Sequence, residues 1–460
     1  MKKNILFLLS FIFSALFFGQ TANLDLSFNP ATSSYTHIRC IAIQSDNKVL
    51  IGGDAYIGQP VPIVAIARLN ANGSFDSTFN PPTTFNNFMT TSIVVQPDGK
   101  ILVGGSDNGS GVKNYISRLN PDGSIDSSFN TGSGANEMVR SIVLQPDGKI
   151  IIAGDFTYVN GHFANYITRL NGDGSIDTSF APQFGPNNKI NSCTLLQNGK
   201  IIINGIFSAY DNVTRNSIAR LNANGTLDTS FDPQITINDF VRSNAVEDNN
   251  GNILFGAYFS INGISKQRLI RLKNDGALDT NFNLDNETDT PIGSICLQSN
   301  QKILIGGELN QYNGIPIKKI ARLNSDGSLD PSFNVGTGPN SAVSSIISIS
   351  NDTIFIYGAF SKYNNNDRFR IAKIIITGNL STADAEKLKI NVYPNPAHDR
   401  LFVSEKNIRT YEIFNMIGQK VSSDTVDKSF IDISNLLKGT YLLKFKLQTG
   451  ETMTQKFIKE

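Results

Sequence analysis

Apolar and polar positions alternate along most of the chain, and turn signals interrupt the alternation at regular intervals. The clearest copy spans residues 116–129, where apolar positions flank the turn sequence Asn120-Pro-Asp-Gly123. Because Asp accepts a tight turn and Gly takes a positive φ at no steric cost, this stretch is predicted to be a β-hairpin with a three-residue loop. That loop sets Arg118 opposite Asp126.

The same hairpin recurs with a period of 51 residues, once 50. Its arginine stands at Arg68, Arg118, Arg169, Arg220, Arg271 and Arg322, with Lys373 in the seventh place. Its aspartate stands at Asp76, Asp126, Asp177, Asp228, Asp279 and Asp330. A fixed period of this length indicates a solenoid, a propeller or an array of repeats.

Each repeat opens with a second hairpin that is apolar at nearly every position, as in residues 93–105 and 142–154. Strands of that kind are buried on both faces. The two hairpins together predict four strands of five to seven residues per repeat, and four-stranded antiparallel units arranged radially form a β-propeller. Opening hairpins near residues 41, 93, 142, 193, 244, 295 and 346 predict an all-β, seven-bladed β-propeller.

The last repeat lacks a fourth strand, whereas the N-terminus carries an unmatched copy of that strand in residues 24–28. We therefore expect residues 24–28 to close the ring by antiparallel pairing with the last repeat. The register of the other repeats predicts Lys373 opposite Asp25 and Ile374 opposite Leu24. Phe28 is expected to fill a position between blades.

Both hairpins, in copies such as residues 67–80 and 95–105, resemble the delta-60 repeat family of bacterial β-propellers. The resemblance covers residues 24–377 and implies a propeller, but no settled activity and no catalytic residues. The repeating Arg–Asp pairs are interpreted as cross-strand ion pairs, which contribute about 0–1 kcal/mol each when exposed. Recurring aromatic residues are interpreted as packing. They include the loop tyrosines Tyr56, Tyr158, Tyr210, Tyr258, Tyr312 and Tyr363.

The N-terminus has the features of a signal peptide: Lys2 and Lys3 precede the apolar run 5–18 and small residues follow it. The run is short for a membrane helix, which needs about 20 residues. We assign residues 1–20 to the signal peptide, 21–377 to the propeller, 378–389 to a linker and 390–460 to a second domain. Cys40, Cys193 and Cys296 lie in repeats that are not neighbours, so buried thiols are expected rather than disulfides.

Short alternating strands with frequent turns predict that residues 390–460 form a small immunoglobulin-like β-sandwich. The motifs Tyr393-Pro-Asn-Pro396, Gly418-Gln419 and Gly439-Thr-Tyr441 resemble the type A C-terminal sorting domain of the type IX secretion system of Bacteroidetes. The motif residues are Pro394, Asn395, Pro396, Gly418 and Gly439. This resemblance implies that the type IX secretion machinery is a partner, and that the protein is secreted or attached to the outer-membrane surface after removal of its signal peptide.

Composition and charge exclude several classes of function. The net charge of +1 argues against a nucleic-acid partner. The three histidines are scattered, and no phosphate loop, nucleophile elbow or zinc spacing occurs. Turns such as residues 120–126 resemble a calcium loop only faintly, because the final Asp faces the arginine and many copies put Asn where calcium needs charge. We expect no metal, no cofactor and a monomer.

Departures from the repeat are the best guide to a ligand, since symmetric residues serve packing. The residue before the first strand of a repeat is arginine three times, at Arg39, Arg140 and Arg242. These arginines are candidates for an anion-binding channel mouth. The expected function is binding or display at the cell surface, or a structural adhesin role, with a glycan or protein ligand that the sequence does not specify. The alternative is a polysaccharide lyase or hydrolase with its site at the channel mouth.

Overall fold

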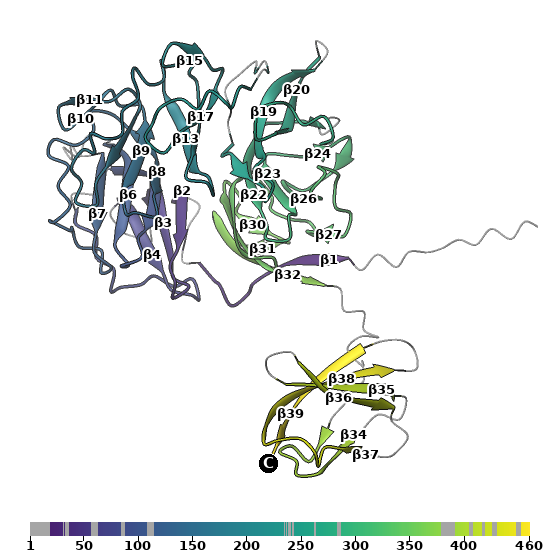
Figure 1. Cartoon of the computed structure of the whole chain (residues 1–460). Coiled ribbons are helices and arrows are strands. Elements are labelled where there is room, and N and C mark those ends of the chain that lie inside the picture. Colours follow the sequence, from purple (N-terminus) through teal and green to yellow (C-terminus); the bar gives the residue numbers. More distant parts are fainter. Residues whose placement is uncertain are drawn as a thin grey trace, which may run out of the picture. The chain divides into compact units, whose positions relative to one another are not determined.

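The computed structural model divides into two compact units, residues 1–379 and residues 380–460. The structure describes residues 19–30, 32, 36–56, 63–83, 88–107, 115–233, 235, 237, 241, 243–261, 264–282, 287–378, 392–403, 408–415, 419–425, 430–447 and 452–460. The secondary structure of these residues is β throughout (Figure 1). No helix in the described part of the chain has the length and hydropathy needed to cross a membrane.

The first unit is built from three-stranded antiparallel sets that recur along the chain. The first strands are β2 (Thr36–Ile43), β5 (Phe88–Val95), β8 (Val139–Leu144), β13 (Ile190–Leu195), β18 (Val246–Glu247), β22 (Ile292–Leu297) and β28 (Val343–Ser350). The second strands are β3 (Val49–Tyr56), β6 (Ile101–Asp107), β9 (Ile150–Gly154), β14 (Ile201–Gly205), β19 (Ile253–Ile261), β23 (Ile303–Gly307) and β29 (Thr353–Gly358). The third strands are β4 (Ile63–Leu69), β7 (Ile116–Leu119), β12 (Ile167–Leu170), β17 (Ile218–Leu221), β20 (Ile264–Leu272), β26 (Ile320–Leu323) and β32 (Ile371–Gly378).

Short hairpins follow several of the second strands. They are β10 (Tyr158–Val159) with β11 (His162–Phe163), β15 (Ala209–Tyr210) with β16 (Val213–Thr214), β24 (Gln311–Tyr312) with β25 (Ile315–Pro316), and β30 (Lys362–Tyr363) with β31 (Asn366–Asp367). We call these the rim hairpins. The remaining strands of this unit are β1 (Gln20–Leu24), β21 (Glu287–Thr288) and β27 (Phe333–Asn334).

The prediction that each repeat has a fourth strand of five to seven residues is wrong. In the copy at residues 116–129 it is one isolated bridge, Leu119 with Ile125. The chain then turns, because Asp126 accepts hydrogen bonds from the Ser128 amide and hydroxyl at 3.0 and 2.6 Å. Short polar side chains that bond the backbone two residues on favour turns over extended strands. The Leu-Asp-x-Ser-Phe pattern is therefore a bridge followed by a turn.

The hydrophobic core of the first unit consists of clusters that each join consecutive sets. One cluster contains Leu50 from β3 and Val103 from β6. Another contains Phe355 from β29 and Ile51 from β3, so the last set also packs against the first. Phe28 is fully buried in that cluster, and its ring meets the ring of Phe355 edge-on at 5.1 Å between centroids.

The N-terminal strand pairs with the last set in the predicted register. Leu24 in β1 pairs with Ile374 in β32, and Lys373 Nζ lies 2.9 Å from Asp25 Oδ2. The expectation that residues 24–28 form this strand is wrong, since the paired strand begins at Gln20 and ends at Leu24. Asp25 and Phe28 lie in the turn that follows, as their counterparts do in other repeats.

The second unit contains two antiparallel sheets around one core. One sheet has the order β33 (Val392–Tyr393), β34 (Arg400–Val403) and β37 (Phe430–Asp432). The other has the order β36 (Lys420–Thr425), β35 (Ile408–Asn415), β38 (Gly439–Leu447) and β39 (Thr452–Lys459). Buried residues of both sheets, such as Leu401 and Phe445, form a single cluster.

Candidate functional site

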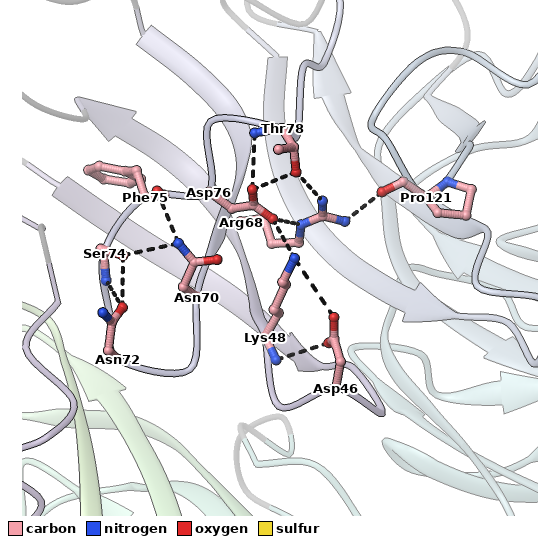
Figure 2. Close-up of polar contacts among 10 residues, drawn as sticks. All are labelled: Asp46, Lys48, Arg68, Asn70, Asn72, Ser74, Phe75, Asp76, Thr78 and Pro121. Atoms are coloured by element: carbon pink, nitrogen blue, oxygen red, sulfur yellow. Dashed lines mark hydrogen bonds and ion pairs between the residues drawn. The ribbon is translucent and has the colours of Figure 1, made fainter.

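The largest set of ionisable side chains in the first unit recurs blade by blade, and Figure 2 shows its first copy. Arg68 Nε donates to Asp76 Oδ2 at 2.7 Å, and Lys48 Nζ donates to the same oxygen at 3.0 Å. The amide and hydroxyl of Thr78 donate to Asp76 Oδ1 at 3.0 and 2.6 Å. The cross-strand register supplies the Arg and the Asp, and the opening hairpin of the same repeat supplies the Lys. We call this arrangement the clasp.

In five repeats the clasp also connects its blade to the next one. Arg68 Nη1 donates to the Pro121 carbonyl in the following repeat at 2.5 Å, and its guanidinium lies 4.8 Å from the centre of the Phe79 ring. Equivalent carbonyl bonds are donated by Arg118 to Gly172, Arg169 to Ala223, Arg220 to Asn274 and Arg271 to Ser325. A guanidinium has the fork of donors and the flat face that these simultaneous contacts need.

The clasp ion pairs are buried, so the expectation of exposed pairs worth little was wrong. The side chains of Arg68 and Asp76 are only 8% and 5% exposed. Burial by itself would raise the pKa of Asp76, but hydrogen bonds from Thr78, Lys48 and Arg68 outweigh it and hold the pKa well below its usual range. The pKa values of Asp126, Asp177 and Asp228 are lowered in the same way.

The sequence contained a signal for the third member of the clasp. The lysine at the end of each Asp-Gly-Lys or Asn-Gly-Lys turn reaches the aspartate of its repeat, as in Lys100 to Asp126 at 2.9 Å and Lys200 to Asp228 at 2.8 Å. A lysine stands at this position in five repeats, at Lys48, Lys100, Lys149, Lys200 and Lys302, and Asn252 and Thr353 replace it in the other two. Because all three guanidinium nitrogens and both carboxylate oxygens of the clasp are bonded within the fold, the clasp is a structural element rather than a reactive site.

The three predicted ligand-binding arginines have different surroundings. Arg140 in β8 donates Nε and Nη2 to Asp155 at 2.5 and 2.9 Å, and Lys189 Nζ donates to the same carboxylate at 2.9 Å. Arg39 in β2 is exposed, and its carbonyl accepts a hydrogen bond from the Tyr357 hydroxyl at 2.8 Å. Arg242 lies outside the described residues. An anion that binds Arg140 would have to compete with Asp155, and the anion site stays a prediction.

The loop tyrosines do not all occupy one position. Tyr210, Tyr312 and Tyr363 are buried, and their hydroxyls donate to the carbonyls of Gly225, Gly327 and Ala22 at 2.5, 2.5 and 2.9 Å. In the β10–β11 hairpin that buried position belongs to Val159, because Tyr158 is one residue out of step with the others. Tyr258 lies half-buried in β19, and Tyr56 ends β3.

Cys40 and Cys193 are buried as expected, whereas Cys296 is half-buried. All three are free. Burial raises the pKa of the Cys193 thiol to about 11, and it raises the pKa of Cys40 further. Thiols with raised pKa values are poor nucleophiles at neutral pH. The described residues contain no group of three or more His, Cys, Asp and Glu side chains that could hold a metal ion.

The sorting motif residues of the second unit hold its last strand. Asn395 Nδ2 donates to the Lys456 carbonyl at 3.2 Å, and Asn395 Oδ1 accepts from the Ile458 amide at 2.9 Å. Pro394 and Pro396 flank this asparagine, and both prolines follow cis peptide bonds. Gly439 begins β38, which pairs with β39 along its length. Gly418 lies outside the described residues.

Two family models match the chain. The model described as a domain of unknown function (DUF5122) beta-propeller matches six segments, residues 44–79, 96–129, 145–180, 196–231, 249–282 and 298–333. The model described as a secretion system C-terminal sorting domain matches residues 391–460. The chain therefore carries β-propeller repeats followed by a type IX sorting domain, and both predicted resemblances are confirmed. This combination implies a secreted or cell-surface protein that interacts with the type IX secretion machinery.

Similarity to individual proteins is local or distant. Beta-agarase D of Zobellia galactanivorans is 38% identical over 71 residues, which are 15% of this chain and 15% of the agarase. PorZ, a surface component of the type IX secretion system of Porphyromonas gingivalis, has a TM-score of 0.46 at 11% identity, and the match covers 94% of this chain and 60% of PorZ. An α-L-arabinanase from Penicillium chrysogenum has a TM-score of 0.32 at 11% identity, over 65% of this chain and 96% of the arabinanase. These similarities do not assign an activity.

Proposed function

We propose that this protein is a seven-bladed propeller that binds an extracellular ligand, and that an immunoglobulin-like sorting domain directs its export. The blade count is supported by the pairing of β1 with β32 and by the cluster that joins Phe355 to Ile51. In the second unit, two sheets packed around one core support a sandwich. The signal peptide at residues 1–20 and the linker at 378–389 belong to the same proposal.

A binding role is supported by the contrast between the side chains that hold the blades together and those that face outward on the rim hairpins. The clasp repeats through the blades and uses its charges internally, whereas the rim hairpins share a backbone register but differ in their outward residues. Scaffolds that hold variable loops on a rigid frame are typical of binding proteins.

The alternative of a polysaccharide lyase or hydrolase needs convergent acid and base groups at the channel. Asp155 is a carboxylate that lies beside one candidate arginine, and it is held by Arg140 and Lys189. Burial would raise the pKa of Asp155, but these two cations lower it, so the carboxylate stays ionised at neutral pH and is a poor general acid. This geometry favours binding over catalysis.

Export is tested by deleting residues 390–460 and locating the protein in a host that has the type IX system. We expect the truncated protein to remain in the periplasm, because the recognised domain is missing. Undiminished surface or medium levels of the truncated protein would contradict the proposal. A substitution on the propeller, Lys362→Ala, is the control that should leave export unchanged, since Lys362 lies exposed on β30.

Binding is tested by screening the full chain against a glycan array and against extracellular proteins, with analysis of any bound glycan for new chain ends. A ligand recovered intact supports the binding role. A glycan that is cleaved with turnover supports the enzymatic alternative. The absence of any retained ligand in both screens would overturn the proposed function.

A further inference from the structure

The β10–β11 hairpin differs from the other rim hairpins at its two outward positions. Tyr158 and Phe163 pair directly across this hairpin, and they are 47% and 65% exposed. Their rings meet edge-on, with 5.6 Å between centroids and an interplanar angle of 79°. The hairpin itself is anchored by the buried Val159, so the exposed pair is not needed to hold it in place.

The same two positions in other blades show what the fold accepts there. The equivalent pairs are Ala209 with Thr214, Gln311 with Pro316, and Lys362 with Asp367. Lys362 and Asp367 lie 3.4 Å apart as an exposed ion pair. Since small, polar and charged pairs all occur at this register, packing does not require aromatic residues in the β10–β11 hairpin.

A third exposed ring belongs to the loop that follows this blade. Phe184 is 51% exposed, and its carbonyl accepts a hydrogen bond from Asn165 Nδ2 at 2.6 Å, two residues beyond Phe163. The amides of Phe184 and Gly185 donate to Asp211 Oδ1 at 2.8 and 2.7 Å, so the loop is also fixed to the next blade.

The equivalent loop positions carry small polar residues. The bridges Ala135 with Val159, Pro186 with Tyr210, and Pro339 with Tyr363 align these loops. The position of Phe184 is therefore held by Ser133 in one loop and by Thr337 in another. We call Tyr158, Phe163 and Phe184 the aromatic platform.

The two segments that carry the aromatic platform lack acidic and basic residues of their own, and the neighbouring Asp211 carboxylate bonds the backbone of Phe184 and Gly185. Residues 157–165 and 181–188 contain no Asp, Glu, Lys or Arg, and neither segment exposes a Val, Leu, Ile or Met. Exposed apolar patches on soluble proteins mark interaction sites. A protein partner of ordinary size covers about 800 Å² with an apolar core, whereas this patch offers three exposed rings among amides, two of which meet edge-on. Flat rings within a polar, uncharged surface suit the apolar faces and hydroxyl edges of neutral sugars.

We propose that the aromatic platform binds a neutral polysaccharide by stacking of sugar rings on Tyr158, Phe163 and Phe184. The proposal rests on the proposed binding function and names its ligand class. It excludes acidic polymers as preferred ligands, because no cation lies in either segment to pair with a carboxylate or sulfate.

The test uses the purified full chain in affinity electrophoresis with laminarin, agarose, xyloglucan and galactomannan, and with alginate as an acidic polymer. The double variant Y158A/F163T copies the pair that β15–β16 already holds, and F184T copies Thr337. The matched control Q311A/P316T makes the equivalent change in β24–β25. All three are expected to keep the melting temperature, because the fold carries these residues at the same register.

We expect at least one neutral polysaccharide to retard the protein, and Y158A/F163T to weaken that binding by about tenfold or more, as for the loss of well-placed aromatic anchors. F184T should weaken it as well, and Q311A/P316T should leave it unchanged. Binding that survives in Y158A/F163T, or a preference for alginate, would overturn the proposal. A protein ligand with no glycan binding would overturn it and leave the proposed function intact, whereas no ligand of either kind would overturn both.

Discussion

The clasp of an internal blade and the ion pair of the closing blade are two versions of one design. In an internal blade, Arg118 and Asp126 are both 8% exposed and lie 2.6 Å apart. In the closing blade, Lys373 and Asp25 are 25% and 14% exposed and lie 2.9 Å apart. Asp25 keeps the turn of its counterparts, since it accepts bonds from the Ser27 amide and hydroxyl at 2.9 and 2.6 Å.

The difference lies in what the cation does beyond its ion pair. Arg118 also reaches the Gly172 carbonyl of the next blade and lies 4.8 Å from the centre of the Phe129 ring. An ammonium group is a point charge and lacks the fork and face for such contacts. The closing blade keeps the backbone link that the internal blades also have: the Asn29 amide donates to the Asn72 carbonyl at 2.8 Å, as the Asn80 amide does to the Asp122 carbonyl. The closing blade thus lacks the side-chain link of the clasp, and its added strand pairing comes from β1.

Acidification should have the largest effect, because it reaches all clasps together. The pKa values of Asp76, Asp126, Asp177 and Asp228 are lowered in the folded protein. Stability from these groups is full above the unfolded pKa of about 3.9 and is lost as the pH falls toward the folded values. We expect the melting temperature to be nearly constant from pH 7 to 5 and to drop steeply below about pH 4. A melting temperature that is unchanged at pH 3 and below would contradict the clasp.

Removal of the closing strand should come next. A protein that lacks residues 19–28 loses β1 and the buried Phe28, and leaves β32 with an unpaired edge. The Phe28→Ala change alone is expected to cost about 3–5 kcal/mol of unfolding free energy. Chemical denaturation followed by circular dichroism measures both variants. Leu26→Ala is the control, since Leu26 is 69% exposed and its loss should change little. A Phe28→Ala protein as stable as this control would refute closure by the N-terminus.

Arg118→Ala should destabilise an internal blade by about 1–3 kcal/mol, because it removes one of the two cations bonded to the buried Asp126 and leaves only Lys100. The measurement is the free energy of unfolding in urea at pH 7. Arg118→Lys keeps the charge but loses the bond to Gly172 and the contact with Phe129, so an intermediate loss is expected. Full stability of Arg118→Lys would show that the fork geometry is irrelevant.

Lys373→Ala should have the smallest effect, about 0–1 kcal/mol, because this pair is partly exposed and screened by solvent. The same urea titration compares it with Arg118→Ala. Added salt should reduce the effect of Lys373→Ala more than that of Arg118→Ala, since exposed pairs are screened more strongly. Equal losses in the two variants would remove the distinction between closing and internal blades.

The sequence by itself determined the repeat, the hairpins and the register. The spacing of Arg118 and Asp126 required their pairing, because the turn between them admits few geometries, and the same rule placed Leu24 opposite Ile374. The motif at Pro394, Asn395 and Pro396 likewise identified the sorting domain from local sequence alone. The local turn pattern sets the register within one hairpin, and its repetition extends that register to residues far apart in the chain, such as Leu24 and Ile374.

Only the tertiary structure decided which side chains are buried and which face solvent. The sequence did not indicate that the pair of Arg118 and Asp126 is buried, because its further partners, Lys100 and the Gly172 carbonyl, come from distant turns. Tyr158 was interpreted as one of the repeating packing tyrosines. In the structure it lies one residue out of step in a two-residue strand, so Tyr158 points outward and Val159 is buried. Successive side chains of a strand point to opposite faces, so a step of one residue reverses a side chain's environment.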